Sequence, residues 1–586
     1  MKKHFLKGIA FALAVCALPV AGCGHKHDFS GEVVSKKYLC TEATCIAPAT
    51  YYYSCECGEK GTETFQSGEK DLRHIYTEMV EDEKYLKTEA SCLEGAVYYK
   101  ACVYCGKKGY GNKTFQSSTL GAHNPTIENP DWAYVKEEAT KTSAATFYKS
   151  CVCGAVGEET FTHGEPLREY TDEEKAARMP TTLTVTLYDT ENSVYGFTYH
   201  TEAKPLRPVI QVSKGDSLSN DFEEYSCSVE VASSMNKAGG TFNYYLVKAE
   251  VPMEDLSTYT YRAYDKYADV GTDAVTVETK DLQSESFTFA HVSDSQSTSG
   301  GGYFSQVLEQ LSGNVDFLLH TGDVVEYSLY EEDWTSMVHN NFTYLSKMPI
   351  MAIAGNHDAI YQAGDNELYE HFNYPVVNGQ DTDSGKGQYY SFTYGNAKFI
   401  MLNTNASSGA RVDEDQLRWL KNELASNTAT WTIVGLHQPM YSPGRYGSSP
   451  DKNSQSLLLR AQLGDLFAQY GVDLVLQGHD HVLSRTYPIG ENGSPVAETW
   501  KEVGGVQYSQ DPSGVIYLMN GPASDQYRIP VDEADASLYS YKKQSNTRSF
   551  ATITIEGNRL TVSAQYVSDS KAMPYADATW GIEKSA

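Results

Sequence analysis

The chain has 586 residues and a formal net charge of −29 at pH 7. This length exceeds one ordinary domain, so we expect three or more folded units. The acidic balance argues against non-specific nucleic-acid binding, which needs a basic surface, and against electrostatic docking on anionic lipid. We therefore expect neither kind of partner.

The first 23 residues are typical of an export signal. Three lysines among the first seven residues precede an apolar stretch from Gly8 to Ala21, which is short for a membrane span. The following "VAGC" resembles the lipobox of bacterial lipoproteins, which implies that Cys23 is lipidated and becomes the mature N-terminus. An ordinary signal peptide next to a cysteine is the alternative. We expect an extracytoplasmic protein, tethered to the bacterial membrane only by its lipid, at the cell surface or in the periplasm.

Residues 24–165 hold most of the cysteines and three copies of one pattern. The copies read "YYYSCECGEKGTETFQSGE", "YYKACVYCGKKGYGNKTFQS" and "FYKSCVCGAVGEETFTHGE". Repeats near 50 residues indicate an array of small modules. These repeats resemble cysteine-rich modules on surface proteins of anaerobic bacteria, which implies a spacer or binding role, with an envelope or surface ligand as the partner.

The spacing of histidine and cysteine predicts a zinc site within each of the first two repeats. His27 precedes Cys45 by 18 positions, and His74 precedes Cys92 by 18. Three thiolates and one imidazole complete a tetrahedral zinc site, and modules this small need such a staple. The expected sets are His27, Cys45, Cys55 and Cys57 in the first repeat, and His74, Cys92, Cys102 and Cys105 in the second.

The third repeat is expected to lack a complete site. It keeps His123, Cys151 and Cys153, but Lys141 stands where the earlier thiol is found. Disulfides are the alternative to zinc, because an exported protein permits them. The odd number of equivalent cysteines in each repeat, and the histidine that recurs in register, favour zinc.

A β-rich domain without visible chemistry is predicted at 166–282. From Thr181 to Asp281, short β-branched and aromatic runs such as "TTLTVTLYD" and "RPVIQVSKG" alternate with turn residues. About seven strands at this spacing predict a β-sandwich.

From residue 283 to 570 the pattern changes to strand, polar loop and helix. Five apolar runs end in Asp, Asn, His or Gln: "FTFAHVSDSQ", "DFLLHTGDVVEYS", "PIMAIAGNHD", "WTIVGLHQP" and "VDLVLQGHDH". Ligands gather at the carboxyl ends of strands in α/β sheets. Oxygen and nitrogen ligands of this type suit Mn, Fe, Zn or Ni, and there are enough for two ions sharing a carboxylate, the arrangement that clamps phosphoryl displacement. Residues 571–586 have no clear pattern and are predicted to be a tail.

The order Asp, Gly-Asp, Gly-Asn-His-Asp, His, Gly-His-x-His resembles the signature of the calcineurin-like metallophosphoesterases. The β-domain placed before it makes the chain similar to the purple acid phosphatase branch, over roughly residues 180 to 570. The resemblance implies an α/β (α+β) core of two packed mixed sheets flanked by helices, preceded by a fibronectin-type-III-like β-sandwich.

The resemblance also implies roles for individual residues. Asp323 would bridge two metal ions, His357 would protonate the leaving oxygen or stabilise the transition state, and Asp358 would orient His357. A metal-bound hydroxide would attack phosphorus. The other implied ligands are Asp294 and His481, with Gln296 beside them, for the first ion, and Asn356, His437 and His479 for the second.

Two positions depart from these families. Gln296 stands where the superfamily has histidine and purple acid phosphatases usually have glycine, so it either ligates or only hydrogen-bonds. Glu326 stands where the purple enzymes have tyrosine, so an iron(III) site is not implied. The expected cofactors are two divalent or mixed-valence ions of Fe, Zn or Mn.

The sequence therefore predicts an extracytoplasmic, metal-dependent phosphoric ester hydrolase that acts on phosphate monoesters. Alternatives are a phosphodiesterase or nucleotide-sugar hydrolase on the same fold, and a surface-binding protein whose phosphatase domain is only a scaffold.

Overall fold

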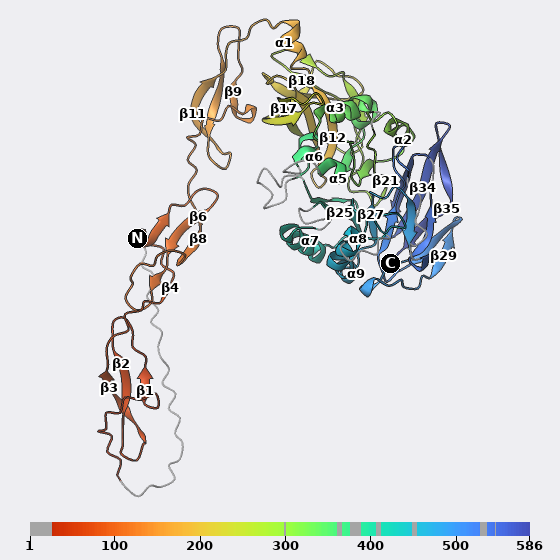
Figure 1. Cartoon of the computed structure of the whole chain (residues 1–586). Helices are drawn as coiled ribbons and strands as arrows, with labels where there is room; N and C mark the ends of the chain where they lie inside the picture. Colours follow the sequence, from red (N-terminus) through yellow and green to blue (C-terminus); the bar gives the residue numbers. More distant parts are fainter. Residues whose placement is uncertain are drawn as a thin grey trace. The chain divides into compact units, whose positions relative to one another are not determined.

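The computed structural model describes residues 26–297, 300–359, 366–375, 388–405, 412–447, 454–527, 536–544 and 547–585 (Figure 1). The predicted export signal and Cys23 lie outside these residues. The chain divides into two compact units, Met1–Asn129 with Phe147–Phe161, and Pro130–Thr146 with Thr162–Ala586. Within the described residues, no helix is both long and apolar enough to cross a membrane.

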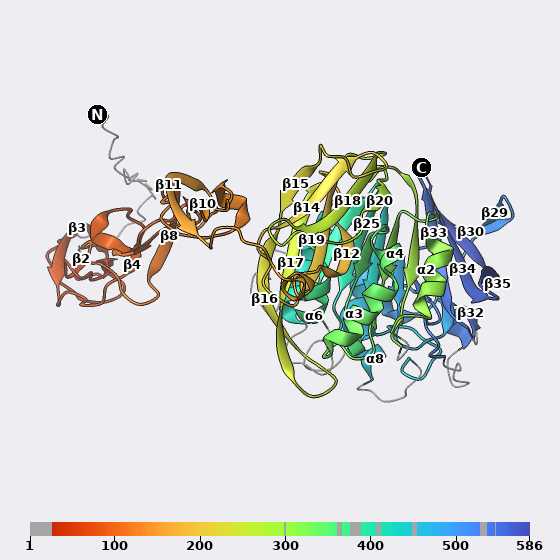
Figure 2. The ribbon, with the colours of Figure 1, turned by 90° about the horizontal axis from the view of Figure 1, so that it is seen from above.

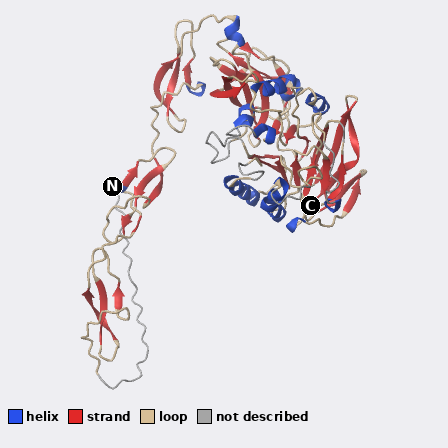
Figure 3. Cartoon of the chain, viewed as in Figure 1, coloured by secondary structure: helices blue, strands red, loops and turns tan. Residues whose placement is uncertain are grey.

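The first unit contains the first two cysteine-rich repeats and part of the third, and the repeats fold as short antiparallel sheets (Figure 3). Few apolar side chains are buried in each repeat; in the first they are Tyr38, Ala49, Cys55 and Phe65. Such small cores contribute little stability by themselves. The strands are β1 (Leu39–Thr41), β2 (Ala49–Ser54), β3 (Lys60–Ser67), β4 (Tyr76–Glu78), β5 (Leu86–Thr88), β6 (Gly95–Tyr99), β7 (Ala101–Cys102), β8 (Thr114–Leu120), β10 (Ala145–Ser150) and β11 (Val156–His163).

The second unit contains a β-sandwich of two antiparallel sheets, as the alternating runs predicted. One sheet has the order β12 (Thr181–Asp189), β13 (Val194–Thr201), β17 (Thr241–Pro252) and β16 (Ser228–Met235). The other has β15 (Glu223–Ser226), β14 (Pro208–Lys214), β18 (Thr258–Asp265) and β19 (Val270–Gly271), with β20 (Val275–Glu278) also paired to β18. The rings of Phe197 and Tyr261, one from each sheet, lie 4.8 Å apart between their centroids.

Two larger mixed sheets follow in the same unit, beside the sandwich strands (Figure 2). The eight-stranded sheet has the order β23 (Ile350–Ala352), β22 (Phe317–His320), β21 (Ser286–Val292), β33 (Ser549–Glu556), β34 (Arg559–Ser568), β35 (Lys571–Glu583), β30 (Val506–Gln510) and β29 (Trp500–Val503). The seven-stranded sheet has the order β24 (Tyr390–Tyr394), β25 (Ala397–Leu402), β26 (Trp431–Leu436), β27 (Leu474–Gln477), β31 (Ile516–Met519), β28 (Leu483–Thr486) and β32 (Tyr539–Lys543).

The two mixed sheets pack against each other through aromatic side chains. Phe289 and Phe317 come from the eight-stranded sheet, and both contact Phe399 of the seven-stranded sheet, at ring distances of 5.1 and 5.4 Å. All three rings are fully buried. Short helices follow several strands: α2 (Phe304–Leu311), α3 (Glu331–Asn340), α4 (Phe342–Leu345), α5 (Asn356–Ala359), α6 (Asn366–His371), α7 (Glu414–Ser426), α8 (Gln455–Leu459) and α9 (Asp465–Gln469).

The predicted C-terminal tail is wrong, because residues 571–583 form strand β35. This strand pairs antiparallel with β34 and parallel with β30. Only its second half is buried, with Ala578, Trp580 and Ile582 facing the interior. The exposed first half has no need of apolar residues, which is why the sequence shows no strand pattern there.

A buried cluster of ionisable side chains joins the sandwich to helices α3 and α6. Glu331 of α3 accepts hydrogen bonds from His200 Nδ1 at 2.9 Å and from His371 Nε2 at 3.1 Å. Burial disfavours the charged forms, yet the imidazoles lower the pKa of Glu331, and Glu331 raises the pKa of His200. A buried carboxylate of this kind depends on its partners.

We predict that Glu331→Gln lowers the free energy of unfolding by about 3 kcal/mol, because it leaves buried imidazoles without their counter-charge. The lowered pKa of Glu331 makes its contribution full above about pH 4.5, and the raised pKa of His200 makes its contribution full below about pH 6.5 and smaller as pH rises. Denaturant unfolding at pH 5.5 and pH 8 measures this difference. The exposed Glu309→Gln is the control, and equal stability of the two variants at pH 5.5 would contradict the prediction.

Candidate functional site

The predicted ligands follow strands of both mixed sheets. Parallel strands β21, β22 and β23 lead to Asp294, Asp323 and Asn356, and parallel strands β26 and β27 lead to His437 and His479. Because the two sheets are packed together, the carboxyl ends of their strands meet at one place. The structure brings these side chains to within hydrogen-bonding distance of one another.

Four of the expected ligands have a left-handed backbone. The φ angles are 55° at Asp294, 56° at Asp323, 77° at His479 and 56° at His481. A non-glycine residue in this region costs roughly 1 kcal/mol or more, and such residues concentrate at functional sites. The surrounding fold therefore holds these four side chains in place at a cost in stability.

Two glycines let the loops that carry these ligands approach closely. A Cβ atom on Gly355 would lie 2.2 Å from the backbone nitrogen of Asp323, and one on Gly322 would lie 2.5 Å from the nitrogen of Gly355. Both distances are shorter than any van der Waals contact. The glycines of the Gly-Asp and Gly-Asn-His-Asp motifs are therefore needed to place Asp323 next to Asn356.

One group of ligand atoms surrounds the imidazole of His437. Its Nε2 lies 3.1 Å from Asn356 Oδ1, 3.3 Å from Asp323 Oδ2 and 3.2 Å from His479 Nδ1. The Nδ1 of the same ring donates to the carbonyl of Thr321 at 2.8 Å, which leaves Nε2 facing the group. This is the orientation that a metal-binding histidine requires.

A second group of ligand atoms also contacts Asp323. His481 Nε2 is 3.1 Å from Asp294 Oδ1, and the amide of Gln296 donates to Asp323 Oδ2 at 3.3 Å. Asp294 also accepts the backbone N–H of His479 at 3.0 Å, which ties the two groups together. Asp323 is thus the side chain that contacts members of both groups.

The charges of the site stabilise each other in the absence of metal. Burial alone would lower the pKa of His437, but the Asp323 carboxylate raises it to about 9. Burial raises the pKa of Asp323, and His437 lowers it below its usual value. A divalent cation takes the place of such a proton, so metal binding weakens as pH falls.

The residues fit metal ions. Asp323, His437 and His479 place their ligand atoms within 4.8 Å of one another. Gln296 is 1% exposed, and its Oε1 has no hydrogen-bond partner among the described residues. A buried carbonyl oxygen without a donor is unusual and is a suitable ligand for a hard cation.

The predicted role of Asp358 is wrong. Its carboxylate accepts the backbone N–H groups of Val324 at 3.0 Å and Gly355 at 2.8 Å, so it joins the loops that carry Asp323 and Asn356. His357 is oriented instead by the carbonyl of Glu326, which accepts from its Nδ1 at 2.8 Å. The sequence could not show that a backbone carbonyl orients His357. It indicated Asp358 only because that residue is its neighbour in the motif.

Gln526 is a further residue of the site, and it was not predicted from the sequence. Its carbonyl accepts His481 Nδ1 at 2.5 Å, and its side-chain amide donates to the Glu326 carboxylate at 2.8 Å. Gln526 follows β31, which is parallel to β27 and ends at the same edge. The apolar run "VIYLM" followed by polar residues could have indicated that this strand also ends at the site.

The cysteine-rich repeats group their ligands differently from the prediction. Cys45 lies with His74, Cys102 and Cys105 of the second repeat, and Cys92 lies with residues of the third, His123, Cys151 and Cys153. His27, Cys55 and Cys57 form a group of three. The predicted within-repeat sets, and the incomplete third site, are therefore wrong, because spacing alone does not show which repeat a loop faces.

Comparisons with known proteins identify the domain that holds the strand-end site. Residues 287–483 match the calcineurin-like phosphoesterase family. The chain is 26% identical over 216 residues to purple acid phosphatase 15 of Arabidopsis thaliana, covering 36% of each, and 28% identical over 298 residues to human acid phosphatase type 7, covering 46% of this chain and 61% of that protein. The solved purple acid phosphatase PPD1 from yellow lupin seeds superposes with a TM-score of 0.57 at 15% identity, over 70% of this chain and 75% of that one.

These similarities confirm the predicted superfamily and the fold of two packed mixed sheets. The lupin structure supports the fold alone, given its low identity. The chain spans 36% and 41% of the lengths of the two Arabidopsis relatives, purple acid phosphatases 15 and 23.

We predict that Asp358→Asn weakens metal binding about tenfold or more, because an amide nitrogen facing the N–H groups of Val324 and Gly355 loosens both loops. Titration of the metal-depleted chain with Mn²⁺ measures the affinity. Asp415→Asn, an exposed aspartate of α7, is the control. Unchanged affinity in Asp358→Asn would contradict the role of Asp358 in holding the two loops together.

Proposed function

Because residues 287–483 form a calcineurin-like phosphoesterase domain related to the purple acid phosphatases, we propose that the chain hydrolyses phosphate monoesters with two bound metal ions. The observation that carries the proposal is the position of Asp323, buried between two groups of oxygen and nitrogen ligands. When bound, two cations generate a nucleophile from water and neutralise the charge of the phosphate.

The ligand assignment follows the two groups of side chains. Asp294, Gln296 and His481 would hold one ion, and Asn356, His437 and His479 the other, with Asp323 shared. Several divalent ions suit these donors, so Fe, Zn and Mn are all candidates. An amide ligand at position 296 would be a particular feature of this chain.

His357 is the residue suited to move a proton. Its side chain is 27% exposed, whereas those of Asp323 and His437 are almost completely buried. Its Nδ1 donates to the carbonyl of Glu326, so Nε2 is the nitrogen that can give a proton to the leaving oxygen. Burial lowers the pKa of His357, but Asp323 and the Glu326 carbonyl raise it above its usual value.

The location is also a proposal. An N-terminal lipid on Cys23 would tether the enzyme outside the cytoplasm, with the cysteine-rich repeats between the lipid and the catalytic domain. The basic and apolar pattern of the first 23 residues supports this reading. The substrate would then be a phosphate ester outside the cytoplasm.

We predict that His357→Ala lowers kcat for p-nitrophenyl phosphate about a hundredfold or more while the metal content stays unchanged. Turnover and metal content are measured on the same preparation. The exposed His339→Ala of α3 is the control. Loss of metal from His357→Ala would contradict the assigned role.

We predict that Asp323→Asn reduces the metal content of both sites and lowers kcat/KM about a hundredfold or more. Asparagine accepts the left-handed backbone of this position, so the substitution tests the charge rather than the fold. Full metal content with a normal rate would refute the shared ligand. Assaying bis-p-nitrophenyl phosphate in parallel, with Mn, Zn and Fe supplied in turn, separates monoester from diester hydrolysis.

We predict that Cys23→Ser moves the protein from the membrane fraction to the soluble fraction, because the cysteine is the only lipid attachment site proposed. Fractionation and labelling with a palmitate analogue measure this. Cys40→Ser is the control, and membrane association without label would favour an uncleaved signal segment.

A further inference from the structure

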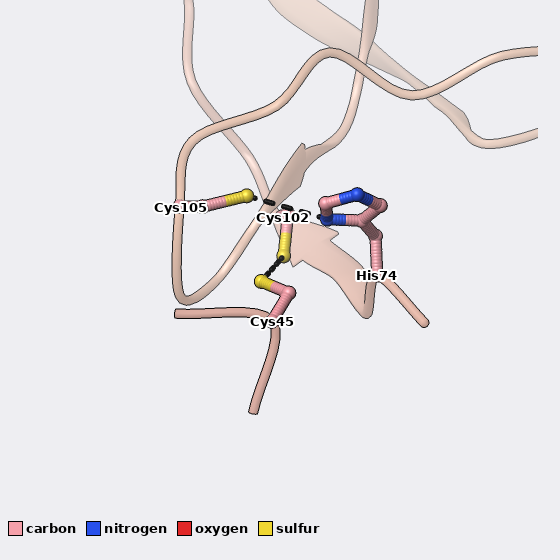
Figure 4. Close-up of side chains that lie close together, drawn as sticks. All are labelled: Cys45, His74, Cys102 and Cys105. Carbon is pink, nitrogen blue, oxygen red and sulfur yellow. Dashed lines mark hydrogen bonds between the residues drawn. The ribbon is translucent and has the colours of Figure 1, made fainter. Parts of the chain in front are cut away.

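Four side chains of two successive repeats, Cys45, His74, Cys102 and Cys105, face one another (Figure 4). Cys45, from the loop between β1 and β2 of the first repeat, lies 3.7 Å from Cys102 between the sulfur atoms. His74 and Cys105 of the second repeat complete the group, with 3.3 Å between His74 Nδ1 and Cys105 Sγ. Three thiols and one imidazole therefore converge from two repeats.

The same arrangement recurs one repeat further along the chain. Cys92, from the loop between β5 and β6 of the second repeat, lies 3.1 Å from Cys151 between the sulfur atoms. His123 Nδ1 lies 3.1 Å from Cys153 Sγ, and the backbone N–H of Asn124 donates to the sulfur of Cys151 at 3.4 Å. Donation of backbone N–H groups to sulfur stabilises thiolates.

Each group is built on a tight turn that ends at a glycine, although the two cysteines are three positions apart in the second repeat and two positions apart in the third. The N–H of Gly106 donates to the carbonyl of Cys102 at 2.8 Å, and the N–H of Gly154 donates to the carbonyl of Cys151 at 2.9 Å. Both glycines have a left-handed backbone, with φ of 66° and 84°. The turn aims the two cysteine sulfurs of its repeat toward the histidine, which stands 28 positions before the first of them in both repeats.

We propose that these groups are two zinc sites, and that each zinc ion joins one repeat to the next. Zinc–sulfur bonds of about 2.3 Å in a tetrahedron place neighbouring ligand atoms about 3.8 Å apart or slightly closer. The four distances between ligand atoms given above, 3.1 to 3.7 Å, are close to this edge length. Three cysteines and one histidine are a common structural zinc set, and a site of this kind is closed, without a position for substrate.

This register explains two features that a site within each repeat leaves unexplained. The third repeat has a complete group although Lys141 replaces its equivalent thiol, because that thiol would serve a following repeat, and the β-sandwich follows instead. The first repeat groups only the three ligands His27, Cys55 and Cys57 among the described residues, because its remaining thiol, Cys45, lies in the group of the second repeat.

The zinc ions would make the three repeats a jointed but stiff spacer. The small cores of the repeats and the short linkers between them give little resistance to bending by themselves. When two successive repeats both bind the same zinc ion, they can no longer bend relative to each other. The length of the spacer would then depend on metal supply and not only on the chain.

The competing arrangement is a disulfide between the closest thiols, Cys45 with Cys102 and Cys92 with Cys151. It would also link successive repeats, but it leaves Cys105 and Cys153 unpaired and gives the histidines no role. In the structure neither pair of sulfur atoms is bonded, because the separations are 3.7 and 3.1 Å. Metal content and thiol titration distinguish the two arrangements.

The test counts zinc in the full chain and in variants, after removal of loosely bound metal. We expect Cys45→Ser and Cys92→Ser each to lose one zinc per chain, and Cys40→Ser, which lies on β1 outside the groups, to lose none. Paired variants then identify the groups even where a single substitution perturbs folding. Cys45→Ser with Cys105→Ser should lose one zinc in total, and Cys92→Ser with Cys105→Ser should lose two.

Sites within repeats would give the reverse: loss of two zinc ions from Cys45→Ser with Cys105→Ser, and loss of one from Cys92→Ser with Cys105→Ser. That result would overturn the proposal. A parent chain with no zinc outside the catalytic centre, in which Cys45, Cys92, Cys102 and Cys151 do not titrate as thiols in denaturant, would overturn it in favour of disulfides. Hydrolysis of p-nitrophenyl phosphate should stay unchanged in every variant. That readout keeps the failure of this proposal distinct from failure of the proposed function.

Limited digestion with trypsin tests the mechanical consequence at one joint. The linker between β3 and β4 holds Lys70 and Arg73, and the Arg73 side chain is 89% exposed. We expect cleavage there to be about tenfold faster in Cys45→Ser than in the parent chain. Without the zinc ion between the first two repeats, the linker unfolds locally more often. Cys92→Ser, which opens the other joint, is the matched control, and equal cleavage in all three proteins would overturn the role of the metal in stiffening.

Discussion

The site depends on one buried carboxylate that two sheets must share. Asp323 follows a strand of the eight-stranded sheet and lies 3.3 Å from His437 of the seven-stranded sheet. It also accepts the backbone N–H of His357 at 2.8 Å. A charge in this position is tolerated because ionisable and polar groups from both sheets surround it. Packing of the two sheets is therefore a condition for the proposed metal site, and the aromatic contacts around Phe399 stabilise that packing.

The backbone around the site is held in positions that few sequences tolerate. Four left-handed residues and the two facing glycines, Gly322 and Gly355, place ligand atoms where their spacing requires. Asp358 and Gln526 contact no proposed substrate, but they fix the loops and the ring of His481. The stability that this strain costs is offset by the large aromatic and aliphatic core beneath the strand ends.

The repeats solve a different problem, because they have almost no core. Their side chains meet in groups of thiols and imidazoles, and two of these groups combine ligands from neighbouring repeats. Metal ligation stabilises a small module far more per residue than apolar burial does. Because each proposed zinc ion binds ligands from two neighbouring repeats, the same ion stabilises both repeats and fixes the length of the spacer.

The amino-acid sequence by itself determined the types of side chain at the strand ends and the fold that carries them. Both follow from local pattern: apolar runs that end in Asp, Asn or His, and β-branched alternation in the sandwich. Strand β35 and the roles of Asp358 and Gln526 were decided only by tertiary structure, because an exposed strand and a backbone acceptor leave no periodic signal. The grouping of Cys45 with His74 was decided in the same way. The spacing of histidine and cysteine in the sequence shows which ligands each repeat contains. Only the packing of one repeat on the next decides which of these ligands come together.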